Sequence, residues 1–262
     1  MSWWEGMLLG VVQGLTEFLP ISSSGHLVVV EAALGITTPG VVIEVVLHVA
    51  TLLAVVIVYR KVLRRLAGGA VVGDRTAWRY ITLLAIGTVP AAMAGLFLEE
   101  WFERTFQSLL LVGLNFFITG TVLWSTRGRV RHAERPSPST QGAFGIGMAQ
   151  ALAILPGISR SGTTVAAALW LGVDPVRAAE FSFLLAVPAI AGAVVLQIPN
   201  LAGGLASAGA LPVAAGFLAA LVSGVMAIRL LIFILRNKAF HRFAPYCWGI
   251  GGITMLFASL GM

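Results

Sequence analysis

The chain has 262 residues, of which 58% are hydrophobic and only 11% are charged, whereas soluble domains carry about 25% charged residues. Its mean hydropathy is +0.93, and apolar runs of about 18 residues or more recur along it, which excludes a soluble globular fold and indicates an integral membrane protein. The formal net charge of +6 comes from basic residues in short loops between apolar runs. This pattern is typical of cytoplasmic membrane loops and not of nucleic-acid binding.

Taken in chain order, the sequence predicts a broken helix over 6–33, three apolar segments, a polar linker, a second broken helix over 143–171 and three more apolar segments. The six apolar segments are long enough to cross a bilayer: 41–58, 80–98, 108–125, 176–197, 212–235 and 243–261. Pro, Gly and Ser interrupt both broken helices, and irregular backbone at membrane depth persists only where protein buries it or water lines it. We therefore expect two re-entrant hairpins that return to the side they entered.

The basic residues test this count of crossings. Of the 17 Lys and Arg residues, 13 lie in three loops at 59–79, 126–142 and 236–242. Two re-entrant hairpins and six crossings place all three loops on one side, which the positive-inside rule makes cytoplasmic. Both termini are then expected outside.

The two broken helices repeat one motif. Residues 9–26, LGVVQGLTEFLPISSSGH, align without a gap on residues 146–163, IGMAQALAILPGISRSGT. Each half then contains a hairpin and three crossings, and because three is odd the second half is inverted relative to the first. The sequence predicts an all-α polytopic membrane protein with a single domain over 1–262, in which repeat one covers about 1–127, a linker about 128–142 and repeat two about 143–262. Such repeats place their site near the midplane, at the repeat interface.

The copies differ at the positions suited to chemistry. The first has Glu17, Ser23 and His26 where the second has Ile154, Arg160 and Thr163. Ionisable groups at membrane depth usually mark function, Ser with an acid or His permits nucleophilic chemistry, and the planar guanidinium of Arg matches phosphate. Both tips can also present N–H groups and hydroxyls to an anion. Expected binding residues are Gln13, Ser22, Ser24, Gly25, Ser159, Ser161, Gly162 and Thr163.

Several structural alternatives stay open at this point. Glu17 and Arg160 could simply pair with each other, and Ser23 could serve in helix packing. Gln13 recurs as Gln150 in the second copy, which also suits packing. His48 could face the site or bond a neighbouring helix, and Glu44 and Glu180, which each begin a crossing, could cap a helix or make a polar contact near the site. Cys247 is interpreted as a packing residue.

QGLTEFLPISSSGH together with LPGISRSGTT resembles the bacterial undecaprenyl-diphosphate phosphatase family, also called the bacitracin-resistance family, and the resemblance covers essentially the whole chain. It implies removal of the terminal phosphate of undecaprenyl diphosphate, which recycles the lipid carrier of peptidoglycan synthesis, and it implies resistance to bacitracin. The family's essential serine, histidine and arginine match Ser23, His26 and Arg160. Its acidic motif, Glu or Gln, then any three residues, then Glu, falls on Gln13 and Glu17. The resemblance also implies a divalent cation, Mg²⁺ or Ca²⁺, with Glu17 as the candidate ligand.

The resemblance places the protein in the bacterial inner membrane as a multi-pass protein surrounded by lipid, with the active site open to the periplasmic face. A homodimer is left open, as is the nucleophile, which could be Ser23, His26 or water. Two other functions are compatible with the sequence. Inverted repeats with broken helices also occur in transporters, so a lipid-phosphate flippase is the main alternative, and an exporter of bacitracin itself has little support.

Overall fold

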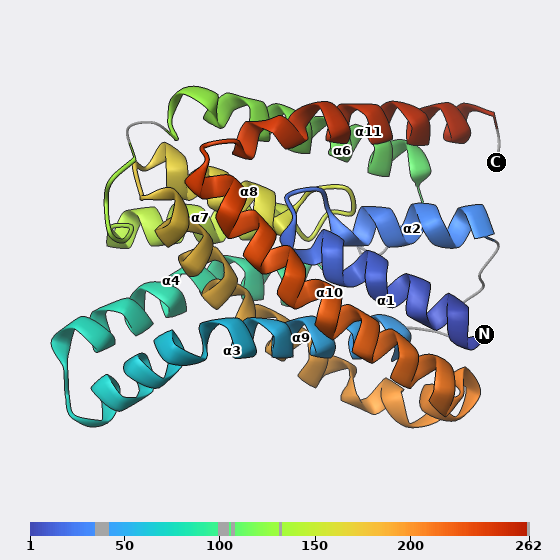
Figure 1. Cartoon of the computed structure of the whole chain (residues 1–262), viewed down its shortest axis with the longest axis horizontal. Coiled ribbons are helices and arrows are strands. Elements are labelled where there is room, and N and C mark those ends of the chain that lie inside the picture. The colour runs from blue at the N-terminus through green and yellow to red at the C-terminus, as the bar shows by residue number, and fades with distance from the viewer. Residues whose placement is uncertain (35–41, 99–104, 106–107, 131–132, 261–262) are drawn as a thin grey trace.

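The computed structural model describes residues 1–34, 42–98, 105, 108–130 and 133–260, and this part of the chain is α-helical. Figure 1 shows an elongated bundle in which most helices run along or obliquely to the long axis. The first half contains α1 (Trp3–Phe18), α2 (Ser23–Leu34), α3 (Val42–Val71), α4 (Arg75–Phe97) and α6 (Leu109–Ser125). The second half contains α7 (Thr140–Leu152), α8 (Arg160–Trp170), α9 (Pro175–Ala208), α10 (Ala210–Arg236) and α11 (Ala244–Ser259), with short 3₁₀ turns η1 (Thr126–Gly128) and η2 (Phe240–Phe243).

Five of the described helices are long and apolar enough to cross a membrane: Ile43–Val71, Arg75–Phe97, Leu109–Gly128, Pro175–Gln197 and Ala210–Arg236. They coincide with the first five predicted crossings. The sixth predicted crossing, 243–261, forms α11, which has 16 residues and falls short of the roughly 20 residues that an untilted crossing needs. Its crossing therefore stays a prediction.

Two predicted loops are largely helical. The basic segment 59–79 was expected as a loop, but α3 continues to Val71 and α4 begins at Arg75. Arg, Lys, Leu and Ala are good helix formers, so the helix extends past the end of the apolar run and carries its charges with it. The segment 198–211, expected as the loop between the predicted crossings 176–197 and 212–235, is likewise helical up to Ala208, and the chain turns at Gly209, whose φ is +83°.

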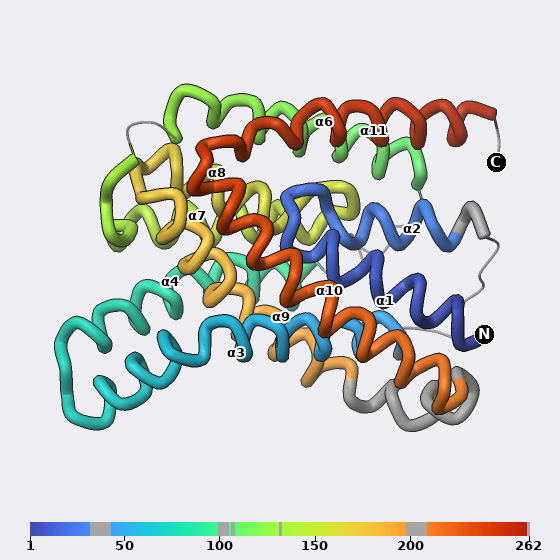
Figure 2. The backbone as a smooth tube through the Cα atoms, in the orientation of Figure 1, coloured from blue at the N-terminus to red at the C-terminus, as the bar shows by residue number. Residues whose placement is uncertain are grey.

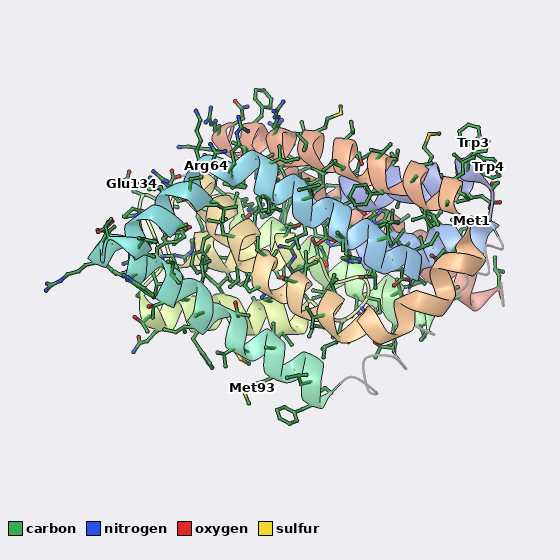
Figure 3. All side chains as sticks on the ribbon, turned by 90° about the horizontal axis from the view of Figure 1, so that it is seen from below. Met1, Trp3, Trp4, Arg64, Met93 and Glu134 are labelled. Carbon is green, nitrogen blue, oxygen red and sulfur yellow. The ribbon has the colours of Figure 1, made fainter. Side chains whose placement is uncertain are left out.

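The basic connections between helices gather at one end of the bundle. In Figure 1 the three basic connections, from α3 to α4, from α6 to α7 and from α10 to α11, lie toward one end of the bundle, and both termini lie toward the other. Figure 3 shows the same separation, with Arg64 and Glu134 at one end and Met1, Trp3 and Trp4 at the other. The three basic loops thus share one end, as the charge pattern predicts.

Each repeated motif forms a helix, a turn and a second helix. α1 ends at Phe18, and α2 begins at Ser23 after a turn in which Ser22 has a φ of +68°. α7 ends at Leu152, and α8 begins at Arg160 after a turn in which Gly157 has a φ of +91°. The helix breaks at the Pro–Ser segments are therefore where the sequence predicts them.

Small residues let the first arm of each hairpin pack closely on a long helix. A Cβ at Gly10 of α1 would overlap the carbonyl oxygen of Gly216 of α10, and a Cβ at Gly147 of α7 would overlap that of Gly87 of α4. Such close backbone approach is typical of membrane proteins, where lipid supplies no hydrophobic drive between helices. It fixes where each hairpin sits.

Candidate active site

The turns of the two motif copies meet inside the bundle. The Ser161 hydroxyl donates to the Leu19 carbonyl oxygen at 3.1 Å, and a Cβ built on Gly25 would lie 3.0 Å from the Cα of Gly157. Figure 2 shows the two turns side by side near the middle of the molecule. Residues 142 positions apart, Leu19 and Ser161, are thereby brought into contact, as a site shared by the two motif copies requires.

The Glu17 carboxylate lies at the centre of this meeting point. Its Oε2 accepts hydrogen bonds from the Ser23 hydroxyl at 2.6 Å and from the Gln13 amide at 3.1 Å. Its Oε1 lies 2.7 Å from Nη2 of Arg160. His48 Nε2 lies 3.9 Å from Oε2. Ser23 and Arg160 therefore bond the two oxygens of a single carboxylate, one from each motif copy.

Arg160 lies at the start of α8, and its side chain is 14% exposed, against 6% for that of Glu17. Beyond the ion pair, Nη1 donates a long hydrogen bond, 3.4 Å, to the Ser182 carbonyl oxygen. A guanidinium has five N–H donors, and these contacts engage only part of them among the described residues. Arg160 therefore does pair with Glu17, and it keeps further N–H groups that could donate hydrogen bonds to an anion.

Ser23 opens α2 and is half-buried. Its hydroxyl already donates to Glu17, which is the geometry in which a carboxylate can take the proton as the oxygen attacks an electrophile. Ser23 also lies at the N-terminus of α2, and a helix N-terminus favours a negatively charged group.

The His26 ring does not bond Ser23, although the spacing of the two residues in the sequence would allow them to act together. Nδ1 bonds the Ser22 carbonyl oxygen and Nε2 bonds the Tyr246 hydroxyl, both at 2.7 Å. The ring stacks on Tyr246 and meets Phe116 edge-on. Both nitrogens are thus engaged away from Ser23, so the geometry favours Glu17 as the group that receives the serine proton.

A scan of the chain against family models matches the family described as "Bacitracin resistance protein BacA" over residues 6–253. The chain belongs to this family. Among its relatives, an "Undecaprenyl-diphosphatase" of Desulfosudis oleivorans is 47% identical over 96% of this chain and 97% of the relative. Proteins of the same name from Syntrophotalea carbinolica, 40% identical over 99% and 100%, and Methanobrevibacter smithii, 37% identical over 96% of each, are similar along nearly their whole length.

The other hydroxyls predicted to bind substrate hold the turns in shape. Ser22 and Ser24 lie 3.5 Å apart through their Oγ atoms, and the Gly25 N–H donates to Ser22. Ser159 caps α8 by accepting from the Gly162 N–H, and its Oγ lies 3.3 Å from that of Ser161. Thr163 donates to the Ser159 carbonyl oxygen. A direct role in substrate binding stays a prediction for these five hydroxyls and for Gly25 and Gly162.

Two polar residues of α6 that lie outside both repeated motifs support the second turn. Asn115 donates to the Pro156 carbonyl oxygen at 2.8 Å, and Thr119 donates to that of Gly157 at 2.9 Å while accepting from the Ser159 N–H at 3.0 Å. Both side chains are buried. They satisfy backbone groups that the broken helix leaves unpaired, which is a requirement at membrane depth.

The remaining candidate residues differ in whether they contact Glu17. His48 lies beside Glu17, whereas its Nδ1 bonds the backbone of Glu44. Glu180 pairs with Arg177 at 3.2 Å on its own helix, α9. Gln13 donates to Glu17, yet its Oε1 is buried without a hydrogen-bond partner in the described part of the chain. A buried acceptor without a partner is costly, and beside a carboxylate it is suited to a cation.

Proposed function

We propose that the protein is an undecaprenyl-diphosphate phosphatase, which hydrolyses the terminal phosphate of undecaprenyl diphosphate to give undecaprenyl phosphate and inorganic phosphate. The observation that carries this is the Glu17 carboxylate, bonded at once to the Ser23 hydroxyl and the Arg160 guanidinium. A hydroxyl with an adjacent base, facing a planar cation suited to phosphate, is what phosphoryl transfer needs. The identity of the substrate is inferred from the family and from the name of its relatives. The activity recycles the cell-wall lipid carrier and opposes bacitracin.

The reaction follows from these positions. Arg160 draws the terminal phosphate toward the α2 N-terminus and neutralises charge on its oxygens. Ser23 Oγ attacks the terminal phosphorus while its proton passes to Glu17. The bond from that phosphorus to the bridging oxygen breaks, and undecaprenyl phosphate leaves with the bridging oxygen. Water then attacks the phosphorus of the serine phosphate, and its oxygen and both protons leave as part of inorganic phosphate. The bond from phosphorus to Ser23 Oγ breaks, and the proton held by Glu17 returns to that oxygen.

A divalent cation, Mg²⁺ or Ca²⁺, belongs to the proposal. In the described residues no group of three or more His, Cys, Asp and Glu side chains is arranged to hold a metal ion, so a closed protein cage does not fit. Mg²⁺ is commonly bound by one or two carboxylates together with substrate phosphates, and Glu17 with the unpartnered Oε1 of Gln13 fits that mode. When bound, the cation would neutralise charge between the two phosphates.

The topology proposed for this activity is a pair of inverted repeats with re-entrant hairpins, in a single domain joined by the linker near 128–142. Helix pairing supports it. α1 packs on α10, and α7 packs on α4, so each hairpin lies against the second crossing of the opposite half. α3 contacts α9, and α6 contacts α11, which pairs equivalent crossings. With the basic end in the cytoplasm, the termini and the entrance to the site face the periplasm.

The identity of the nucleophile can be tested by trapping the phosphorylated enzyme. Detergent-purified protein is mixed with diphosphate lipid labelled in its terminal phosphate and quenched within one turnover. We expect label on Ser23 and none on the Ser23→Ala variant. Label retained by Ser23→Ala would refute the serine mechanism and favour His26, whereas absence of label from active wild type would favour direct attack by water.

A flippase is the alternative that inverted repeats and broken helices support. Phosphate release from the diphosphate lipid in detergent separates the two, because no membrane sides exist there. We expect release by the wild type and its loss in Arg160→Ala. A protein that releases no phosphate under these conditions would be a flippase and not a phosphatase. Bacitracin resistance that survives Arg160→Ala would instead favour direct export of the drug.

A further inference from the structure

A cavity of about 660 Å³ lies away from the Glu17 site, where α6 and α10 end. It is lined by Arg127, Asn237, Lys238, His241 and Arg242. Arg127 belongs to the η1 turn that follows α6, and the other four belong to the connection between α10 and α11. The volume is within the range of about 300–1,000 Å³ that is usual for small-ligand sites.

The lining has one sign of charge. Arg127, Lys238 and Arg242 are permanent cations, and no carboxylate lines the cavity. The ion pairs of the described residues join His48 and Arg160 to Glu17 and Arg177 to Glu180, so they include none of the three cavity cations. Three cations that converge on one cavity repel each other, and an anion inside it would offset that repulsion.

The cavity lies at the boundary between membrane and water. Two of the apolar spans end beside it, at Gly128 and at Arg236. Aromatic side chains form the adjoining surface: the Arg127 guanidinium lies 4.9 Å over the ring of Trp124, and Trp124 packs against Trp248. Tryptophans mark the headgroup level of a bilayer. Phe233, one turn before the end of α10, is 64% exposed and continues the apolar surface toward the membrane.

The backbone at Lys238 is a second unusual feature. Lys238 follows the end of α10 with a φ of +54°, a position that glycine usually occupies because a side chain is strained there. The Lys238 N–H still closes the helix by bonding the Leu235 carbonyl oxygen. A cationic side chain thus lines the cavity at a position where backbone geometry alone favours glycine.

We propose that this cavity binds a phosphate-bearing anion, and that its source is the headgroup of an acidic phospholipid in the cytoplasmic leaflet. Basic pockets between membrane helices on that side are suited to acidic headgroups. The cations would bind the phosphodiester, while Trp124 and the exposed face of α10 would lie along the glycerol and acyl chains. The site would tie the α6 and α10–α11 ends of the protein to the lipid surface, far from the phosphatase centre.

The test compares two triple variants of the full-length chain in detergent. Arg127→Gln/Lys238→Gln/Arg242→Gln removes the cavity charges, and Arg64→Gln/Arg75→Gln/Arg79→Gln removes equal charge from exposed positions on the α3–α4 connection at the same end. Binding of dioleoyl phosphatidylglycerol, dioleoyl phosphatidylcholine and inorganic phosphate is measured by native mass spectrometry. Phosphatidylglycerol affinity should fall about 100-fold in the cavity variant, since each basic residue near an anionic membrane surface contributes roughly fivefold, and should change little in the control.

Phosphatidylcholine is expected to bind weakly to the wild type and to every variant. Equal loss of phosphatidylglycerol binding in both triple variants would overturn the proposal, because the interaction would then be a diffuse effect of charge. Inorganic phosphate that binds with the same dependence on the cavity cations would overturn the lipid assignment. Misfolding is separated by a third variant: Arg127→Lys/Arg242→Lys keeps the charge and should retain most phosphatidylglycerol binding. Phosphatase activity is not used as a readout, so the result is independent of the proposed reaction.

Discussion

The exchange of Glu17 for Gln separates a catalytic role from a structural one. The two side chains have the same shape, but Gln removes the negative charge that faces Arg160 at 2.7 Å. Removing one partner of a buried ion pair costs about 3–5 kcal/mol of stability. The same change removes the base beside Ser23, which should lower kcat by about 10²–10⁴-fold.

The double variant Glu17→Gln/Arg160→Gln distinguishes these effects. Two neutral amides can hydrogen-bond to each other, so most of the lost stability should return, leaving a deficit of about 1–2 kcal/mol. Activity should stay lost, because both the base and the phosphate ligand are absent. Thermal unfolding in detergent measures the first quantity, and phosphate release from undecaprenyl diphosphate measures the second.

The Arg177–Glu180 pair is a control, because it has the same chemistry but lies within α9 with an Arg side chain that is 48% exposed, against 11% for its Glu. Arg177→Gln/Glu180→Gln should leave activity within about twofold, because neither side chain contacts Glu17, Ser23 or Arg160 in the ion pairs and hydrogen bonds of the described residues. If the Glu17/Arg160 double variant recovered activity together with stability, the pair would be purely structural and the proposed roles of both residues would be wrong.

Three further outcomes follow from single contacts. Gly147→Ala should destabilise the protein by about 1–3 kcal/mol, because the new Cβ overlaps the backbone of α4. Gly145→Ala, two residues away with open space around it, should be neutral or stabilising by about 0.5–1 kcal/mol. Equal melting temperatures for the two variants would contradict the close packing of α7 on α4. Tyr246→Phe removes the hydroxyl that bonds His26 and should cost about 1 kcal/mol. It should leave the pH–rate profile unchanged, because Glu17 takes the Ser23 proton; a displaced profile would assign a catalytic proton to His26. Chelation of divalent cations with EDTA should abolish phosphate release. Gln13→Glu should lower the Mg²⁺ concentration for half-maximal activity by roughly tenfold. An unchanged Mg²⁺ dependence in Gln13→Glu would exclude position 13 from the cation site.

The helix breaks and the meeting of the two tips were predictable because the information is local and repeated. Pro20 with the following serines, and Pro156 with Gly157, cannot continue a helix, and the same phrase occurs twice in the chain. Glu17, Ser23 and Arg160 were found where the copies differ. Their shared carboxylate contact follows from two tips that approach each other, so chemistry at the centre of the site was accessible from sequence.

Other features depend on partners that the sequence does not pair. Tyr246 is 220 positions from His26, and nothing in the local pattern of α11 marks it as a histidine partner. Asn115 and Thr119 are polar residues within an apolar run, which is a signal of buried function or packing, but their roles depend on a turn some 40 residues away. The length of α3 was underestimated because hydropathy marks the apolar span and not the end of the helix.

The side-chain differences between the two copies follow from the way the tips meet. A charged group at the centre of a bilayer costs about 2.5–3.5 kcal/mol or more when unpaired. Had both hairpins kept Glu17-like acids, two carboxylates would face each other, and two Arg160-like tips would repel in the same way. An acid on one copy and a guanidinium on the other give a neutral pair at 2.7 Å that can be buried. That pair also presents opposite functions, a proton acceptor and a phosphate ligand, to one point between the hairpins, so the arrangement that makes the buried tips tolerable is the one that makes them reactive.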